Sequence, residues 1–147
     1  MEHVHIPNAA LVLVSDGRRA LFLRNKGTPK APELVMERGL ESENPPTREQ
    51  GTDRPGRKPG SDGVSQSAVG ETDFHDLAEE RFAATVADTL YQMEHAHQFE
   101  DLVVIAPPKM LGDLRARLHQ EVADCVVAEV AKDLTTHSIP EISRLLS

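Results

Sequence analysis

The residues best suited to chemistry form a basic segment between Thr47 and Lys58. It holds four cations, Arg48, Arg54, Arg57 and Lys58, against two anions, on a chain whose formal net charge is −8. Arginine side chains bind phosphate groups bidentately, and the glycines of the segment allow a ligand to approach the backbone closely. The segment therefore predicts contacts to a phosphorylated ligand. The alternative is a solvated loop whose charges keep it soluble.

A second candidate is Asp16, which follows the apolar run 11–15 and precedes Gly17. Ligands of open α/β sheets gather at the carboxyl ends of strands, so a carboxylate here can take part in the magnesium site of a phosphodiesterase. The alternative, which the Asp-Gly dipeptide favours, is a turn residue of a tight hairpin. A metal site would need further carboxylates, and the candidates are Asp73, Asp76, Glu79, Asp101 and Asp133.

The remaining reactive side chains predict no metal and no organic cofactor. His75 and Glu79 lie four residues apart, a spacing that could ligand a metal but is more often part of a solvated helix face. The single cysteine, Cys125, excludes an internal disulfide, and its apolar neighbours are typical of an inert core thiol. The sequence has no nucleophile elbow, no phosphate-binding glycine loop and no Cys-x-x-Cys motif.

The composition limits the partners that we expect. Aromatic residues make up only 3% of the chain, which argues against a stacking platform for single-stranded nucleic acid. The negative charge disfavours a global electrostatic attraction to nucleic acid or to an anionic membrane, and no apolar run approaches the length of a membrane span. No secretory signal is visible. We therefore expect a cytoplasmic protein with no membrane partner.

Three short segments predict an antiparallel meander in the first part of the chain. Residues 9–15 form a continuous apolar run of strand length, the pattern of a strand that is buried on both faces. The dipeptide Asp16-Gly17 predicts a tight hairpin, after which residues 19–25 form the return strand. Residues 33–37 are predicted to form a third strand.

The middle of the chain predicts a long loop followed by a long helix. Residues 41–72 contain four prolines and five glycines, so they can bury little apolar surface, and we expect a flexible loop. Thr72 or Asp73 can cap the helix, whose apolar stripe runs from Phe74 to Met93 at steps of three and four residues.

The last part of the chain predicts alternating strands and helices. Apolar runs at 101–106 and 125–130 indicate buried strands, and helices are expected over 110–118 and 139–146. The whole order predicts a single domain over residues 1–147. Its fold class is α/β of the ribonuclease H-like type, with a mixed five-stranded sheet and helices on the faces of the sheet.

The stretch from Asn44 to Arg57 resembles the signature of the bacterial host attachment protein family, the proteins required for attachment to host cells. Residues 11–17, 104–108 and 129–135 agree with the same family, so the similarity covers nearly the whole chain. That family is similar to the central domain of archaeo-eukaryotic peptide-chain release factors. The resemblance implies a ribonuclease H-like fold, in agreement with the element order above.

The resemblance also implies a position for a functional glutamine. In release factors, a Gly-Gly-Gln loop before the long helix enters the peptidyl transferase centre and helps to place the water that hydrolyses peptidyl-tRNA. The matching stretch here is Gly63-Val64-Ser65-Gln66, in which Ser65 stands in place of the second glycine. Gln50 is an alternative counterpart that also lacks the glycine pair.

Three functions follow from these patterns. The first is a release-factor-like module that engages ribosome or tRNA, with RNA-binding residues Arg48, Gln50, Arg54, Arg57 and Lys58. The second is a hydrolase that acts on peptidyl-tRNA through Gln66 or, with a divalent metal, on a phosphodiester through Asp16. The third is a protein-interaction module in host attachment.

Overall fold

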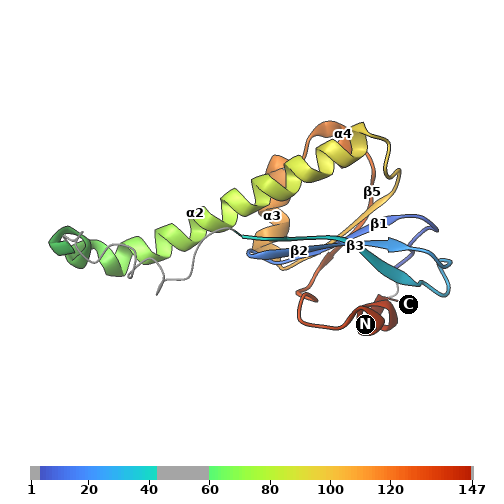
Figure 1. Ribbon diagram of the computed structural model, residues 1–147, viewed down its shortest axis with the longest axis horizontal. Coiled ribbons are helices and arrows are strands. Elements are labelled where there is room, and N and C mark those ends of the chain that lie inside the picture. Colours follow the sequence, from blue (N-terminus) through green and yellow to red (C-terminus); the bar gives the residue numbers. More distant parts are fainter. Residues whose placement is uncertain (1–3, 43–59, 147) are drawn as a thin grey trace.

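The computed structural model describes the backbone of residues 4–42 and 60–146, and the side chains of residues 4–42 and 76–146. In this part of the chain the strands form one mixed five-stranded sheet with the order β3-β2-β1-β4-β5 (Figure 1). The pairs β1–β2 and β2–β3 are antiparallel, and the pairs β1–β4 and β4–β5 are parallel. The strands are β1 (Leu11–Ser15), β2 (Arg19–Asn25), β3 (Leu34–Glu41), β4 (Leu102–Ala106) and β5 (Val126–Ala131).

The strands β1 and β4 lie side by side in the middle of the sheet, and every residue of both is buried. Their sequences, Leu-Val-Leu-Val-Ser and Leu-Val-Val-Ile-Ala, are continuous apolar runs. Strands of this kind require cover on both faces of a sheet, which helices supply. The prediction of a mixed five-stranded sheet that begins with an antiparallel meander is confirmed.

Helices lie on both faces of this sheet, with an apolar core beneath each layer (Figure 1). The helices α2 (Gly60–His95) and α3 (Pro108–Arg117) cover one face, and α5 (Ile139–Leu146) covers the other. Alternation along β1 sends Leu11 and Leu13 into the first core and Val12 and Val14 into the second. A short helix that the sequence did not predict, α4 (Gln120–Ala123), lies between α3 and β5.

The long helix α2 begins at Gly60, which corrects the prediction that it starts at Thr72 or Asp73. The predicted loop 41–72 is wrong over residues 60–72, which are helical, and Glu41 belongs to β3; residues 43–59 lie outside the described residues. The error has a physical reason. The amino-terminal part of α2 projects beyond the sheet (Figure 1), so it needs no apolar stripe, and apolar periodicity was the signal used to place the helix.

The edge strand β3 is longer than the predicted 33–37, and most of its residues are exposed. Its ladder with β2 is irregular, because Phe22 pairs with Arg38 and Leu23 pairs with Met36. Glu37 is therefore the extra residue of a β-bulge. Exposure explains the short prediction, since the last part of β3 lacks a continuous apolar pattern.

Packing against the sheet should dominate the stability of α2. Leu90 is fully buried in the core beneath this helix, so Leu90→Ala should lower the free energy of unfolding by about 2–5 kcal/mol. The matched control is Leu77→Ala on the same helix, where the residue is 44% exposed and the change should stay within about 0.5 kcal/mol. Urea denaturation followed by circular dichroism measures both. Equal losses would contradict the packing described.

Glu37, the extra residue of the bulge, should make the free energy of unfolding depend on pH. Arg24 donates from Nη2 to Glu37 Oε1 at 3.0 Å and from Nε to Oε2 at 3.2 Å, and these hydrogen bonds lower the pKa of Glu37 below its ordinary value of 4.5. A lowered folded pKa gives stabilisation that is complete above the unfolded pKa and is lost as the pH falls through the folded pKa. We expect the stability advantage of the wild type over Glu37→Gln to disappear on acidification below 4.5. Urea denaturation at successive pH values tests this, and an advantage that is independent of pH would refute it.

Candidate functional site

The carboxyl ends of β1 and β4 meet at one edge of the sheet because these strands are parallel neighbours. After β1 the chain turns into β2 on one side, whereas after β4 it continues through α3 to β5 on the other side. Open α/β sheets bind ligands at such a change of direction, just outside the strand ends. We call this region the carboxyl edge.

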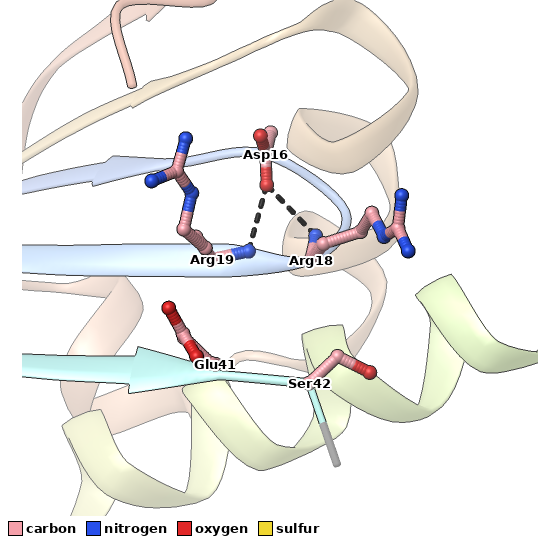
Figure 2. A pocket seen from close by; sticks show the side chains of 5 residues that line it. All are labelled: Asp16, Arg18, Arg19, Glu41 and Ser42. Atoms are coloured by element: carbon pink, nitrogen blue, oxygen red, sulfur yellow. Dashed lines mark hydrogen bonds between the residues drawn. The ribbon is translucent and has the colours of Figure 1, made fainter. Parts of the chain in front are cut away.

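A hollow of about 460 Å³ opens on the carboxyl edge (Figure 2). The residues that line it come from the end of β1, the β1–β2 turn, the start of β2 and the end of β3, and they are Asp16, Arg18, Arg19, Glu41 and Ser42. All of these side chains are polar or charged, so the hollow suits a hydrophilic ligand. Its two arginines and two carboxylates balance, which leaves this lining without net charge.

One carboxylate oxygen of Asp16 holds the β1–β2 turn. Asp16 Oδ1 accepts the backbone N–H of Arg18 at 2.8 Å and that of Arg19 at 2.7 Å (Figure 2). The backbone N–H of Asp16 donates to the carbonyl of Arg19 at 2.9 Å, which closes the turn. Asp16 is thus a turn residue, as the Asp-Gly dipeptide predicts, and its Oδ1 is already engaged.

Gly17 lies close to α2 and does not adopt a left-handed backbone, since no glycine in the described residues has a positive φ. A Cβ on Gly17 would lie 2.6 Å from Cδ of Glu79 on α2. Glu79 Oε1 lies 3.7 Å from Nζ of Lys109 on α3, and Lys109 also donates to Asp113 at 3.1 Å. The hydrogen bond to Asp113 raises the pKa of Lys109. The pair of Glu79 and Lys109 connects α2 to α3 at the surface beside the turn, above the apolar core that packs the two helices together.

The second carboxylate oxygen of Asp16 faces the segment that follows β5. Asp16 Oδ2 lies 3.1 Å from the hydroxyl oxygen of Thr135, which itself lies 2.7 Å from Asp133 Oδ1. Thr135 is buried, and its backbone N–H also donates to Asp133 Oδ1 at 3.0 Å. A hydroxyl has one proton and donates it to one acceptor at a time. Thr135 therefore links two carboxylates that are far apart in the sequence.

The metal-site hypothesis finds further carboxylates near this place, since Glu41 lines the same hollow and Glu79 packs beside Gly17. Asp133 approaches Asp16 through the Thr135 hydroxyl, whereas Asp101 directly precedes β4 at the opposite edge, and the side chain of Asp73 lies outside the described side chains. Among the described residues, no group of three or more histidine, cysteine or carboxylate side chains is placed to hold a metal ion.

Arg18 and Arg19 present two guanidinium groups at the turn. Both residues are exposed, and Figure 2 shows their side chains leaving the turn in different directions. Arg19 lies opposite Glu41 in the ladder between β2 and β3, so the side chains of these two residues share one face of the sheet. Within the described part of the chain, neither guanidinium has a hydrogen bond or an ion pair. Both can therefore bind an anionic ligand.

The residues predicted from the sequence to bind RNA, Arg48, Gln50, Arg54, Arg57 and Lys58, lie outside the described residues. The structure places Gln66 within α2. The implied position of Gln66 in a loop before the long helix is therefore wrong. The side chain of Gln66 lies outside the described side chains.

Sequence reasoning missed five residues of the carboxyl edge, Arg18, Arg19, Glu41, Ser42 and Thr135. For the arginines a signal was present, because two adjacent cations directly follow the Asp-Gly turn of a predicted central strand. For Thr135 there was none, since it lies 119 positions from Asp16 and the contact exists only in the folded chain.

Cys125 has the properties of an unreactive thiol. It is half-buried, and burial raises its pKa above the ordinary value, with smaller contributions from carboxylates such as Glu94 and Asp101. The thiolate is the nucleophilic form of cysteine, so a raised pKa makes this side chain a poor nucleophile at neutral pH.

The strand order, the helices on both faces and the polar carboxyl edge together define an α/β domain of the ribonuclease H-like type. Comparison with known protein families then identifies the family of this chain. The model of a family described as bacterial archaeo-eukaryotic release factor family 12 matches residues 9–146, and the chain belongs to this family. The match confirms the resemblance to release-factor domains.

An uncharacterized protein of Rickettsia prowazekii (strain Madrid E) is similar to this chain, with 33% identity over 75 residues. The alignment covers 50% of this chain and 50% of that relative, so the matched region spans half the length of each. Among the helices that the structure describes, none combines the length and the apolar content needed to cross a bilayer.

The turn contacts of Asp16 predict its contribution to stability. Asp16→Ala leaves two backbone N–H groups without their acceptor, so the free energy of unfolding should fall by about 1–3 kcal/mol. Asp16→Asn keeps an oxygen acceptor and should lose less. A control is Asp88→Ala on α2, where the side chain is 75% exposed and the change should stay within about 0.5 kcal/mol. Thermal and urea denaturation measure the three variants, and an Asp16→Ala protein as stable as the control would rule out the turn role.

Proposed function

We propose that this protein is a release-factor-like module that engages ribosomal RNA or tRNA through its carboxyl edge and through the basic segment at residues 47–58. The observation that carries the proposal is the location of the hollow. Glu41 and Ser42 line it and are the last described residues before that segment. The two arginines of the turn line the same hollow as Glu41 and Ser42, and these two residues come shortly before the basic segment in the sequence.

The balance of charge determines the kind of binding that we expect. The chain as a whole carries a formal charge of −8, which opposes a general attraction to a polyanion. Cations are in excess at residues 47–58, where four stand against two anions, and the turn adds two arginines beside two carboxylates. Binding should therefore be local, of modest affinity and strongly dependent on salt, because each phosphate contact releases counterions.

The geometry of α2 supports the same proposal. Its amino-terminal part extends beyond the sheet (Figure 1), and among its described side chains burial begins at Phe82. In the release factors that this family resembles, the segment before the long helix reaches the peptidyl transferase centre. A projecting helix that follows a basic segment is suited to a similar approach to RNA.

Hydrolysis of peptidyl-tRNA by Gln66 is the second candidate, because Gln66 lies on the projecting part of α2. Against it, Ser65 replaces the glycine of the release-factor motif, and both residues are helical here. Glycine pairs serve loops that need backbone conformations closed to other residues. A turnover assay on peptidyl-tRNA with the wild type and Gln66→Ala separates the candidates. Turnover by the wild type that is lost in Gln66→Ala would favour the hydrolase.

The basic segment should carry much of the affinity for ribosomes. The triple replacement of Arg48, Arg54 and Arg57 by alanine should reduce cosedimentation of the protein with ribosomes. It should also lower the slope of log affinity against log salt by about two, because three phosphate contacts are lost. Sedimentation through sucrose cushions at several salt concentrations measures both quantities.

A matched variant controls for the loss of positive charge. Lys26, Lys30 and Arg81 are exposed, and none of them lines the hollow. Their joint replacement by alanine removes the same charge and should change cosedimentation much less. Identical behaviour of the two triple variants, or cosedimentation that is unchanged by either, would exclude the proposed role of the segment. Under this proposal, a role in attachment to host cells would be an indirect consequence of RNA engagement.

A further inference from the structure

We infer that the hollow at the β1–β2 turn binds one ribonucleotide unit of an RNA chain and distinguishes RNA from DNA through Glu41. This inference rests on the RNA engagement proposed above and adds a recognition element that the basic segment does not provide. Arginines bind phosphates of RNA and DNA alike. A carboxylate that accepts a hydrogen bond from a ribose hydroxyl can separate the two.

The cationic part of the hollow suits the backbone of a nucleic acid. Arg18 and Arg19 are exposed, and neither guanidinium has an ion pair within the described residues. Their side chains leave the turn in different directions (Figure 2), so they are placed for two neighbouring phosphates rather than for one. Guanidinium groups bind phosphate oxygens in a forked geometry that lysine cannot provide.

The acceptor part of the hollow suits a sugar. Glu41 lies opposite Arg19 in the ladder and therefore beside it on the same face of the sheet. Among the described residues, no side chain or backbone group donates a hydrogen bond to the Glu41 carboxylate. An ionised carboxylate can only accept hydrogen bonds, and the 2′-hydroxyl is the donor that RNA has and DNA lacks. A phosphate bound by Arg19 would place its ribose next to this acceptor.

The charge balance of the hollow favours RNA over DNA. Two carboxylates stand against two guanidinium groups, and a DNA strand would bring its phosphates near Glu41 without the 2′-hydroxyl that can donate to this carboxylate. A ribonucleotide offers both an anion and a donor. The volume of about 460 Å³ lies within the range of about 300–1,000 Å³ that is usual for small-ligand sites. Because none of the lining residues is aromatic, binding should not depend on the base.

Fluorescence anisotropy with a labelled single-stranded RNA and the DNA of the same sequence tests the inference. The wild type should bind RNA about threefold to tenfold more tightly than DNA, the worth of one ordinary hydrogen bond at an exposed site. Glu41→Ala should abolish this preference by weakening RNA binding alone. Arg19→Ala should weaken the binding of both strands by about tenfold.

The β2–β3 turn, at the opposite end of these strands, supplies matched controls. Glu33→Ala and Lys30→Ala make the same changes of charge at exposed positions there and should leave both affinities unchanged. Equal binding of RNA and DNA by the wild type, or an RNA preference that survives Glu41→Ala, overturns the inference. If cosedimentation with ribosomes still depends on residues 47–58, the proposed function stands even when the inference about Glu41 fails. Loss of that dependence with an intact RNA preference would instead contradict the role of the segment.

Discussion

Complete burial of β1 and β4 is the constraint on which the rest of this structure depends. Neither strand has a residue that reaches solvent, so both need helices above and below, and polar groups can collect only where the strands end. The one polar residue of β1, Ser15, is its last, and its hydroxyl lies 2.9 Å from the carbonyl oxygens of both Asp16 and Arg19 within the turn. The parallel pairing of β1 with β4 then brings these polar ends to one edge of the sheet.

The hollow depends on contacts between parts of the chain that are remote in sequence. Asp16 shapes the hollow by holding the β1–β2 turn with one carboxylate oxygen, and its other oxygen contacts the Thr135 hydroxyl. Thr135 is buried and belongs to the segment after the last strand. The conformation of a turn near the start of the chain is thus coupled to the segment that leads into α5. Local sequence alone does not determine its geometry.

The fold was largely predictable because its signals are apolar and periodic. Continuous apolar runs located β1 and β4, and the Asp-Gly dipeptide located the hairpin, since burial and turn geometry act within a few residues. The start of α2 was not predictable in this way. Helices are recognised by the stripe that they bury, and the part of α2 before Phe74 projects away from the sheet.

The candidate site was predictable only in part. Asp16 was identified by its place at the end of a central strand. Arg18 and Arg19 follow it closely in the sequence, but they belong to no recognised motif. Glu41 was assigned to the edge of a loop, because an exposed edge strand has little apolar pattern. Its position across from Arg19 follows from the register of the ladder, which a bulge shifts and which no local pattern in the sequence specifies.

The bulge at Glu37 affects how two copies of this protein can associate through the edges of their sheets. Among the described strands β3 lies at one margin of the sheet, and a regular extended margin is a template on which another polypeptide can add a strand. The extra residue bends β3 locally, and the pairing of Glu37 with Arg24 keeps a charge at that point. A second chain would meet a distorted, charged border, even though Val35 and Met36 expose apolar surface beside it. The same irregularity that shifts the ladder therefore disfavours the addition of a strand at this margin.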